Sequence, residues 1–186
     1  HGCDTNKCKE APEGEDPGVP ELKEDNTLEE LLKCNEGKII NQHIVLTHDN
    51  VIDSDAIGHC DLINSTIIGY AISDSAENMG GKVKIKLKEQ KTLQRSLFKS
   101  IQNSTISNIV FEGGANYENK QDPNASQFGI LANEISDSSL SHIDMTGAWT
   151  IKTGRSLEHI GSVAGKVSNS ILSDVHYTGG ISIDVN

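Results

Sequence analysis

The sequence has few aromatic residues and no long apolar segment. Aromatic residues make up 4% of the 186 residues, and the chain has a single tryptophan. This scarcity disfavours a core built from bulky rings and suits a thin core of Ile, Val and Leu. No apolar run approaches the ~20 residues that a membrane-spanning helix needs, so we expect no transmembrane segment.

Positive charge is also scarce. The only arginines are Arg95 and Arg155, and the formal net charge is −11. Because phosphate binding depends on clustered Lys and Arg, nucleic acid and anionic membranes are disfavoured as partners. Two arginines, both between repeated segments, also offer little to a polysaccharide lyase, which needs a cation to stabilise an enolate.

A four-residue phrase occurs four times in the chain. It consists of Asn or Asp, then Ser, then a variable residue and an aliphatic one: Asn64-Ser65-Thr66-Ile67, Asn103-Ser104-Thr105-Ile106, Asp137-Ser138-Ser139-Leu140 and Asn169-Ser170-Ile171-Leu172. The aliphatic positions are 39, 34 and 32 residues apart. A nearly constant period of this length is typical of solenoid proteins.

The last three phrases continue with apolar residues at spacings of three and then two, as in Ile106, Ile109 and Phe111. This spacing predicts a short strand, a bend and a second short strand. The Asn or Asp before the serine, and a closing glycine, suit corners with positive φ. We therefore expect one structural ladder, formed by Asn64, Asn103, Asp137 and Asn169.

A third strand is predicted upstream of the last two phrases, within Phe128 to Ala132 and Ile160 to Gly165. Three short strands per coil predict an all-β fold, a parallel β-helix over residues 38–186. The alternating segment Ile181 to Asn186 reads as a strand with no cap after it. We therefore expect the chain to be the N-terminal piece of a longer protein.

The N-terminal region has a different composition. Residues 1–26 are acidic and hold three of the four prolines, which predicts a tether. The segment Thr27-Leu28-Glu29-Glu30 matches a capping box, followed by leucines on one stripe. It predicts a short helix from Leu28 to Cys34, ended by Gly37. We expect residues 27–37 to cap an apolar end of the β-helix.

Two segments resemble the GLUG-type repeat of large bacterial surface and secreted proteins. They are Ile160 to Ile183 (IGSVAGKVSNSILSDVHYTGGISI) and Phe128 to Ile151 (FGILANEISDSSLSHIDMTGAWTI). The Gly-Leu-x-Gly core is not literal, since Gly129-Ile130-Leu131-Ala132 lacks the second glycine. The resemblance covers about the last two thirds of the chain and implies an exported, right-handed β-helix. GLUG-like repeats also occur in secreted metalloproteases.

The chain has four cysteines, Cys3, Cys8, Cys34 and Cys60. An even number in an exported chain predicts disulfides, and four cysteines permit three connectivities. We favour Cys3 with Cys8 and Cys34 with Cys60, because the second pair would tie the cap to the first coils. Alternatively, Gly2-Cys3 before an acidic, Pro-containing segment resembles the start of a bacterial lipoprotein, which implies a lipid anchor at Cys3.

The candidate metal and catalytic motifs of the sequence have simpler interpretations. His43, His48 and His59 lie near Asp49, Asp53, Asp55 and Asp61, but an EF-hand starting at Asp53 lacks its required oxygen ligands. We expect a solvated Asp-rich turn, with no metal and no cofactor. No Gly-x-Ser-x-Gly occurs. Asp144 and His176 would be neighbours on adjacent coils, where a solvated surface is the default interpretation.

Two insertions are candidate binding surfaces. Residues 80–88 alternate basic and apolar residues, which predicts a strand with Lys82, Lys84, Lys86 and Lys88 on one outer face. That face is either simply solvated or a cationic stripe for an acidic glycan or partner. The polar segment from Glu112 to Gln127 is predicted to be a loop that exposes Tyr117.

These observations favour a non-catalytic segment of a secreted or cell-surface bacterial protein. Its role would be adhesion, host interaction or a stalk, with a host glycan or an extracellular protein as partner. The alternatives are a carbohydrate-active β-helix enzyme, or an accessory module of a larger secreted protease. No His-Glu-x-x-His occurs in the chain, so protease activity would belong to other sequence.

Overall fold

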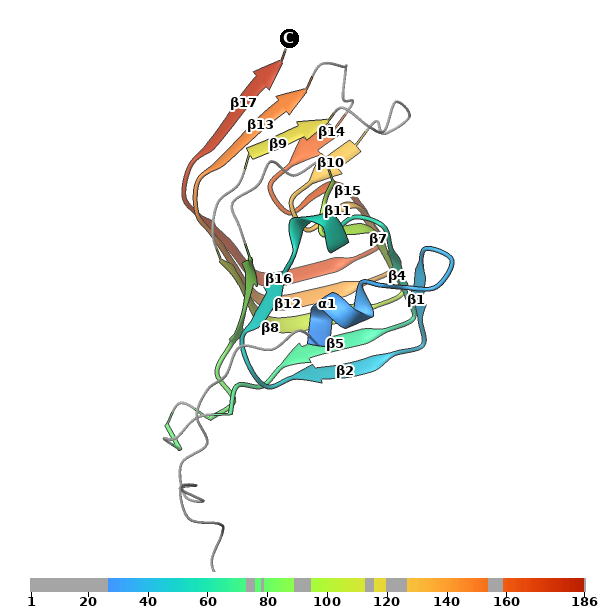
Figure 1. Ribbon diagram of the computed structural model, residues 1–186, viewed down its shortest axis with the longest axis vertical. Helices are drawn as coiled ribbons and strands as arrows, with labels where there is room; N and C mark the ends of the chain where they lie inside the picture. The colour runs from blue at the N-terminus through green and yellow to red at the C-terminus, as the bar shows by residue number, and fades with distance from the viewer. Residues whose placement is uncertain are drawn as a thin grey trace, which may run out of the picture.

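The computed structural model describes residues 27–72, 76–77, 79–88, 95–112, 116–119, 127–153 and 159–185 (Figure 1). Within these residues the fold is all-β and the strand pairs are parallel, apart from two isolated antiparallel bridges. The described part has one α-helix, α1 (Thr27–Leu31), and one short 3₁₀ helix, η1 (Ser54–Ala56). The predicted all-β class is confirmed.

The largest sheet has seven strands. Its main path runs in the order β16-β12-β8-β5-β2, and β6 pairs with both β3 and the second half of β8. The strands are β2 (His43–Leu46), β3 (Asn50–Ile52), β5 (Thr66–Gly69), β6 (Val83–Leu87), β8 (Thr105–Glu112), β12 (Ser139–Thr146) and β16 (Ile171–Thr178).

Three further sheets complete the described structure. A five-stranded sheet has the order β1-β4-β7-β11-β15, with β1 (Lys38–Ile40), β4 (Asp61–Ile63), β7 (Phe98–Gln102), β11 (Ala132–Ser136) and β15 (Ala164–Ser168). A three-stranded sheet has the order β17-β13-β9, with β9 (Asn116–Asn119), β13 (Trp149–Thr153) and β17 (Ile181–Val185). The last sheet pairs β10 (Gln127–Gly129) with β14 (His159–Gly161).

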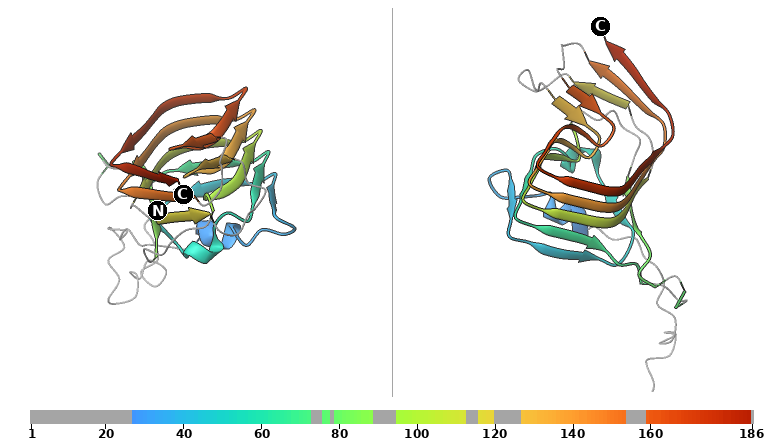
Figure 2. Two further views of the ribbon diagram at one scale, coloured as in Figure 1. Left: turned by 90° about the horizontal axis from the view of Figure 1, so that it is seen from above. Right: turned by 180° about the vertical axis from the view of Figure 1, so that it is seen from behind.

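The chain returns to the same sheet in the same register at each phrase. Ile67, Ile106, Leu140 and Leu172 are consecutive partners in the seven-stranded sheet. Ile44 of β2 continues this row below Ile67, so Asn41-Gln42-His43-Ile44 is a fifth copy of the phrase that the sequence analysis missed. Figure 2 shows the strands of successive repeats stacked in layers. These parallel sheets are compatible with the predicted β-helix.

The predicted corners also form. Asn64, Asn103, Asp137 and Asn169 have φ between 46° and 50°, which is the left-handed region that Asn and Asp tolerate. The bend within each long strand has the same conformation, at Asn108, His142 and Asp174. Asn and Asp therefore turn the chain at one corner of each repeat, and a second polar residue bends it four residues after the serine.

The number of strands per repeat is higher than predicted. Residues 127–153 contain four strands, because the segment predicted as one strand from Phe128 to Ala132 bends between β10 and β11. Glycine allows this bend to pack closely. A Cβ on Gly129 would lie 2.2 Å from Ala164 Cα, and one on Gly161 would lie 2.0 Å from Ala164 O.

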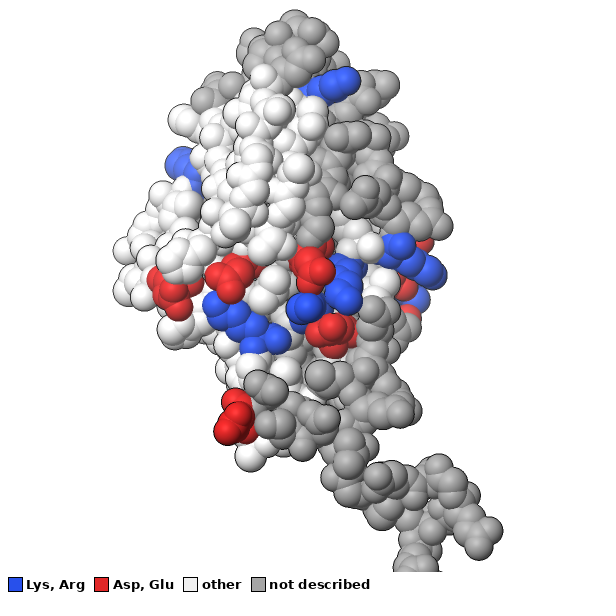
Figure 3. All heavy atoms as spheres, turned by 90° about the vertical axis from the view of Figure 1, so that its left-hand side faces the viewer, with Lys and Arg blue, Asp and Glu red and all other residues white. Residues whose placement is uncertain are grey.

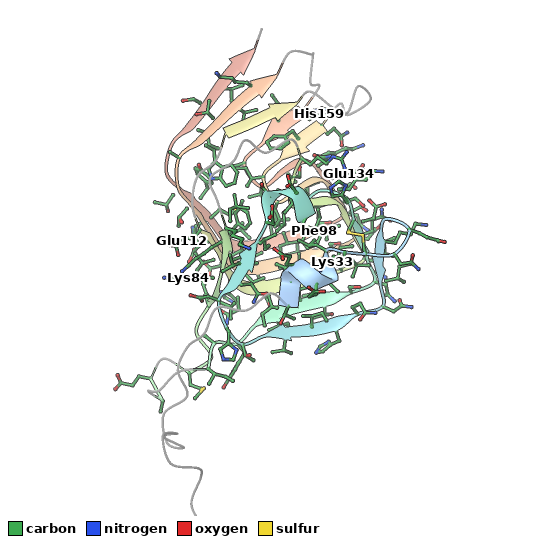
Figure 4. All side chains as sticks on the ribbon, viewed as in Figure 1. Lys33, Lys84, Phe98, Glu112, Glu134 and His159 are labelled. Carbon is green, nitrogen blue, oxygen red and sulfur yellow. A yellow bond between two sulfur atoms is a disulfide. The ribbon has the colours of Figure 1, made fainter. Side chains whose placement is uncertain are left out.

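The core is a continuous row of aliphatic residues between the sheets, with a few rings. Trp149 stacks on Phe111 with ring centroids 5.8 Å apart, and Phe98 points into the interior (Figure 4). The largest fully buried side chains are Trp149, Phe98, Phe128, Leu28, Leu46, Ile52, Leu62, Ile67, Leu97, Ile101, Ile135 and Leu140. The thin aliphatic core expected from the composition is present.

Helix α1 is shorter than predicted and is held by tertiary contacts. It ends at Leu31 rather than at Cys34, after which Lys33 N–H bonds the Glu30 carbonyl oxygen at 3.2 Å. The first helical turn is anchored from β3, since Asn50 Oδ1 accepts from Leu28 N–H at 2.7 Å. Leu28 and Leu32 are buried, and Leu28 reaches the interior lined by Ile67 and Ile106. The helix therefore fills the interior beside β3 and β5.

Candidate functional site

The corner that precedes the seven-stranded sheet carries a ladder of side-chain amides. Asn64 Nδ2 donates to Asn41 Oδ1 at 2.6 Å, and Asn103 Nδ2 donates to Asn64 Oδ1 at 3.2 Å. Asn169 Nδ2 donates to Asp137 Oδ1 at 2.5 Å. The four predicted ladder residues thus lie in one row, with Asn41 as a fifth member. These side chains are exposed and bonded to one another, which indicates a structural role.

A second ladder, which the sequence analysis did not assign, is formed by the serines of the phrase. Each corner N–H donates to the serine hydroxyl of the next repeat: Gln42 to Ser65, Ser65 to Ser104, Ser104 to Ser138 and Ser138 to Ser170, at 3.0, 3.0, 3.1 and 3.0 Å. Each of these hydroxyls donates to the carbonyl oxygen two residues before it, at 2.7 to 2.8 Å. The hydroxyl therefore carries the hydrogen-bond ladder around a corner where strand pairing is interrupted.

The signal for this serine ladder was present in the sequence, because serine follows Asn or Asp in all four copies of the phrase. Ser65, Ser104 and Ser138 are 3%, 4% and 6% exposed. A buried hydroxyl needs a partner, and here one side chain both accepts and donates. The serines are thus structural and are not available as nucleophiles.

The bend within the long strands carries a cluster of titratable side chains. His142 Nδ1 lies 2.6 Å from Asp174 Oδ2, and His176 Nε2 lies 2.5 Å from Asp174 Oδ1. His176 is also the strand partner of Asp144, as predicted for adjacent coils. The hydrogen bonds from His142 and then from His176 hold the pKa of Asp174 below its ordinary value of 3.8.

This shift predicts a pH dependence of stability. Because the pKa of Asp174 is lower in the folded chain, its contribution is present above the unfolded pKa and is lost as the pH falls through the folded pKa. In urea unfolding at pH 5 and at pH 2.5, Asp174→Asn should lose less stability than the wild type. Asn suits this position because it tolerates positive φ. Equal losses in the two proteins would contradict the assignment.

The predicted lysine face forms, and it is paired with acidic residues. Lys82 Nζ lies 2.7 Å from Asp144 Oδ2, Lys84 Nζ lies 3.5 Å from Glu112 Oε2, and Lys86 Nζ lies 3.8 Å from Asp49 Oδ2. Lys84 and Glu112 lie on the same outer side (Figure 4). Figure 3 shows acidic and basic side chains gathered in one band across this side.

We call this band, made of the three ion pairs Lys82–Asp144, Lys84–Glu112 and Lys86–Asp49, the charged band. The acidic residues of the band lie on other strands and loops, so the sequence of residues 80–88 by itself shows only the lysines. Lys88 is exposed at the end of β6. The charged band is therefore a mixed surface rather than a purely cationic stripe, and each exposed pair contributes little to stability.

Tyr117 lies in a strand rather than in a loop. The backbone of Asn116–Asn119 forms β9, which pairs with β13. The prediction of a loop from Glu112 to Gln127 is wrong for this part. The side chain of Tyr117 lies outside the described residues, so its exposure stays a prediction.

One of the two favoured disulfides is present. Cys34 and Cys60 are joined, with their Cα atoms 6.2 Å apart, and the bridge ties the segment after α1 to the start of β4. Residues 1–26, which include Cys3 and Cys8, lie outside the described residues. The pairing of Cys3 with Cys8, the tether and the lipid anchor therefore stay predictions.

Asp53, His59 and Asp61 of the early repeats have structural partners. Asp53 accepts from Asp55 N–H at 3.0 Å and caps η1, and His59 contacts both Asp55 O and the Arg95 guanidinium. Asp61 accepts from Ser100 Oγ at 2.7 Å. Among the residues that the structure describes, no group of three or more His, Cys, Asp or Glu is placed to hold a metal ion.

Comparison with protein-family models, with curated proteins and with solved structures gives no match to this chain. The likeness to the GLUG-type repeat therefore stays a prediction from the residues. Within the described ranges, no helix has the length and apolar character that crossing a membrane requires.

Proposed function

We propose that the chain is a segment of a right-handed, solenoid-like parallel β-helix from a secreted or cell-surface protein, with GLUG-like repeats. Its proposed role is non-catalytic: adhesion, host interaction or a stalk. The observation that carries this proposal is the serine ladder. The serine side chains that recur in the phrase form hydrogen bonds that join one repeat to the next. A scaffold of this type presents long, regular outer faces to a partner.

The proposed location is extracellular. The Cys34–Cys60 disulfide supports it, because such bonds persist in oxidising compartments and are rare in the cytosol. The proposed partner is a host glycan or an extracellular protein. Because the lysines of the charged band are paired with carboxylates, the band favours a ligand with both donors and acceptors over a polyanion.

Binding to the charged band can be tested on an array of glycans and extracellular-matrix proteins. For a ligand of the band, Lys84→Glu should weaken binding about tenfold, or ~1.4 kcal/mol. Lys84→Glu/Glu112→Lys keeps the net charge but inverts the pattern, so it should also bind weakly. Lys33→Glu makes the same charge change on the segment after α1, and it should bind like the wild type.

The outcomes separate the roles. Saturable binding that both band variants lose supports recognition through the charged band. Binding that neither variant changes places the ligand elsewhere on the molecule. No binding to any array member contradicts the adhesion role and leaves the stalk.

A carbohydrate-active enzyme is the second candidate, because Asp144 forms an ion pair with Lys82 and is the strand partner of His176. A carboxylate with a neighbouring imidazole and ammonium can serve as an acid–base set. Release of reducing sugar from an array hit, lost in Asp144→Asn, would overturn the non-catalytic proposal.

A further inference from the structure

Tyr70 is an exposed aromatic residue in a chain that has few of them. It is 49% exposed, whereas the aromatic side chains of the core are Phe98, Phe111, Phe128 and Trp149. The hydroxyl of Tyr177 donates to Gly147 O at 2.9 Å and to Gly180 O at 3.0 Å. In the part of the chain that the structure describes, no group bonds the Tyr70 hydroxyl. The fold therefore leaves much of this ring, and its hydroxyl, open to a partner.

One side of the Tyr70 ring lies on Gly80. A Cβ built on Gly80 would lie 2.8 Å from Tyr70 Cε2 and 3.2 Å from Tyr70 Cζ, so the ring occupies space that any other residue would need. Gly80 also has a φ of 79°, a conformation that other residues rarely adopt. The exposed part of the ring is the side turned away from Gly80.

The backbone beneath the ring is held by hydrogen bonds. Ala71 N–H donates to Gly81 O at 3.0 Å, and Ala71 O accepts from Gly80 N–H at 2.8 Å. Asn108 Nδ2 donates to Gly80 O at 3.0 Å and to Gly81 O at 3.2 Å. A side chain on a fixed backbone loses little conformational freedom when a ligand binds, which favours affinity.

Tyr70 lies beside the charged band (Figure 3). Gly80, which carries the ring, is two residues before Lys82, a step of at most about 7 Å. Lys82 Nζ lies 2.7 Å from Asp144 Oδ2, and these two side chains are 28% and 35% exposed. Asn108, which bonds Gly80, lies on β8, between β6 and β12. The ring and the ion pair are thus within reach of one disaccharide.

This combination fits a sugar ring better than a protein or a polyanion. A pyranose has a C–H face that stacks on an aromatic ring, and hydroxyls at its edge that both donate and accept. The Lys82–Asp144 pair offers such hydroxyls an ammonium donor and a carboxylate acceptor. A standard protein interface buries about 800 Å² on each partner, whereas the exposed apolar side chains beside Gly80 are only Tyr70 and Met79. The paired lysines disfavour a polyanion.

We propose that Tyr70 is the stacking platform of a glycan-binding site, and that the site takes a neutral pyranose. The C–H face of the sugar lies on the exposed side of the ring, and its hydroxyls bond Lys82 Nζ and the Asp144 carboxylate. This inference rests on the proposed function, because it names a ligand class and a further binding residue beside the charged band. Gly80 is a positioning residue, since it acts by seating the ring.

Binding of the full chain to an array of neutral oligosaccharides, sulfated glycans and extracellular-matrix proteins tests the proposal. The neutral members are built of glucose, galactose and N-acetylglucosamine, and the affinity for the strongest of them is measured by titration calorimetry. Tyr70→Ala should weaken binding about tenfold. Tyr70→Leu should do the same, because leucine is apolar but has no ring face. Tyr70→Phe keeps the ring and should bind like the wild type.

Two further variants separate the platform from general effects. Gly80→Ala keeps the ring but places a Cβ against it, so binding should fall. Ile40→Ala removes an apolar side chain that is 44% exposed on β1, and it should bind like the wild type. Circular dichroism checks that each variant is folded. In saturation-transfer NMR, irradiated aromatic protons should transfer to the sugar C–H protons in the wild type and in Tyr70→Phe, but not in Tyr70→Ala.

The contrary outcomes are distinct. Binding that Lys84→Glu weakens and Tyr70→Ala leaves unchanged overturns the platform and keeps the proposed function. Binding that Tyr70→Leu retains, or that Tyr70→Phe loses, overturns stacking on the ring face. Hits confined to proteins or sulfated glycans overturn the choice of a neutral pyranose. No hit of any kind overturns the platform and contradicts the adhesion role as well.

Discussion

Replacement of Ser104 by alanine is expected to destabilise the fold by about 2 to 3 kcal/mol. Ser104 Oγ accepts from Ser65 N–H at 3.0 Å and donates to Gln102 O at 2.7 Å, and its side chain is 4% exposed. Alanine fills most of the same space but leaves the buried Ser65 N–H without its partner, and the Gln102 carbonyl oxygen keeps only the bond from Asn64 N–H at 3.0 Å. The free energy of unfolding, from urea titration, measures the effect.

The control is Ser107→Ala, three residues further along the chain and within β8. Ser107 faces outward and is partly exposed, so its replacement should change the free energy of unfolding by less than about 0.5 kcal/mol. Ser104→Thr keeps the hydroxyl and should recover part of the loss. If Ser104→Ala and Ser107→Ala are equally stable, the serine ladder does not hold the corner.

Removal of the Cys34–Cys60 disulfide is expected to cost about 3.5 kcal/mol. The two cysteines are 26 residues apart in sequence, and the bridge limits the conformations of that long segment in the unfolded chain. It also fixes the segment after α1, whose Leu28 and Leu32 are buried in the core. Cys34→Ala/Cys60→Ala should lower the unfolding midpoint in urea accordingly.

A matched control is available within the same chain. Cys3→Ala/Cys8→Ala removes the same number of thiols and keeps the Cys34–Cys60 bridge. It should unfold like the wild type if residues 1–26 are a tether. Reduction of the wild type should reproduce the effect of Cys34→Ala/Cys60→Ala. An unchanged midpoint after reduction would show that the bridge adds no stability.

The corners could be predicted from the sequence because their cause is local. Asn and Asp tolerate positive φ through their own short polar side chains, so the residue type reports the backbone conformation. The same holds for the aliphatic row, whose spacing fixes which side chains face inward. Helix α1 was predicted in place but not in length, because its first turn is held by a contact with β3 and the segment after it by the bridge to Cys60.

The lowest phrase was missed for two reasons. Gln42 stands where the other copies have serine, and the separation from Gln42 to Ser65 is only 23 residues. A search for one repeated phrase with one period passes over such a copy. Its membership in the ladder follows from the register of β2 on β5, which is a property of the folded chain.

The sequence by itself determined the all-β class, the corners and the row of aliphatic residues, and it favoured Cys34–Cys60 among three possible connectivities. Only the tertiary structure decided how the polar side chains are used. Lys82 meets Asp144 across 62 residues, and His142, Asp174 and His176 meet across adjacent strands. The physical reason is range: backbone conformation is set by neighbouring atoms, whereas ion pairs and hydrogen bonds between repeats depend on the register of strands far apart in sequence.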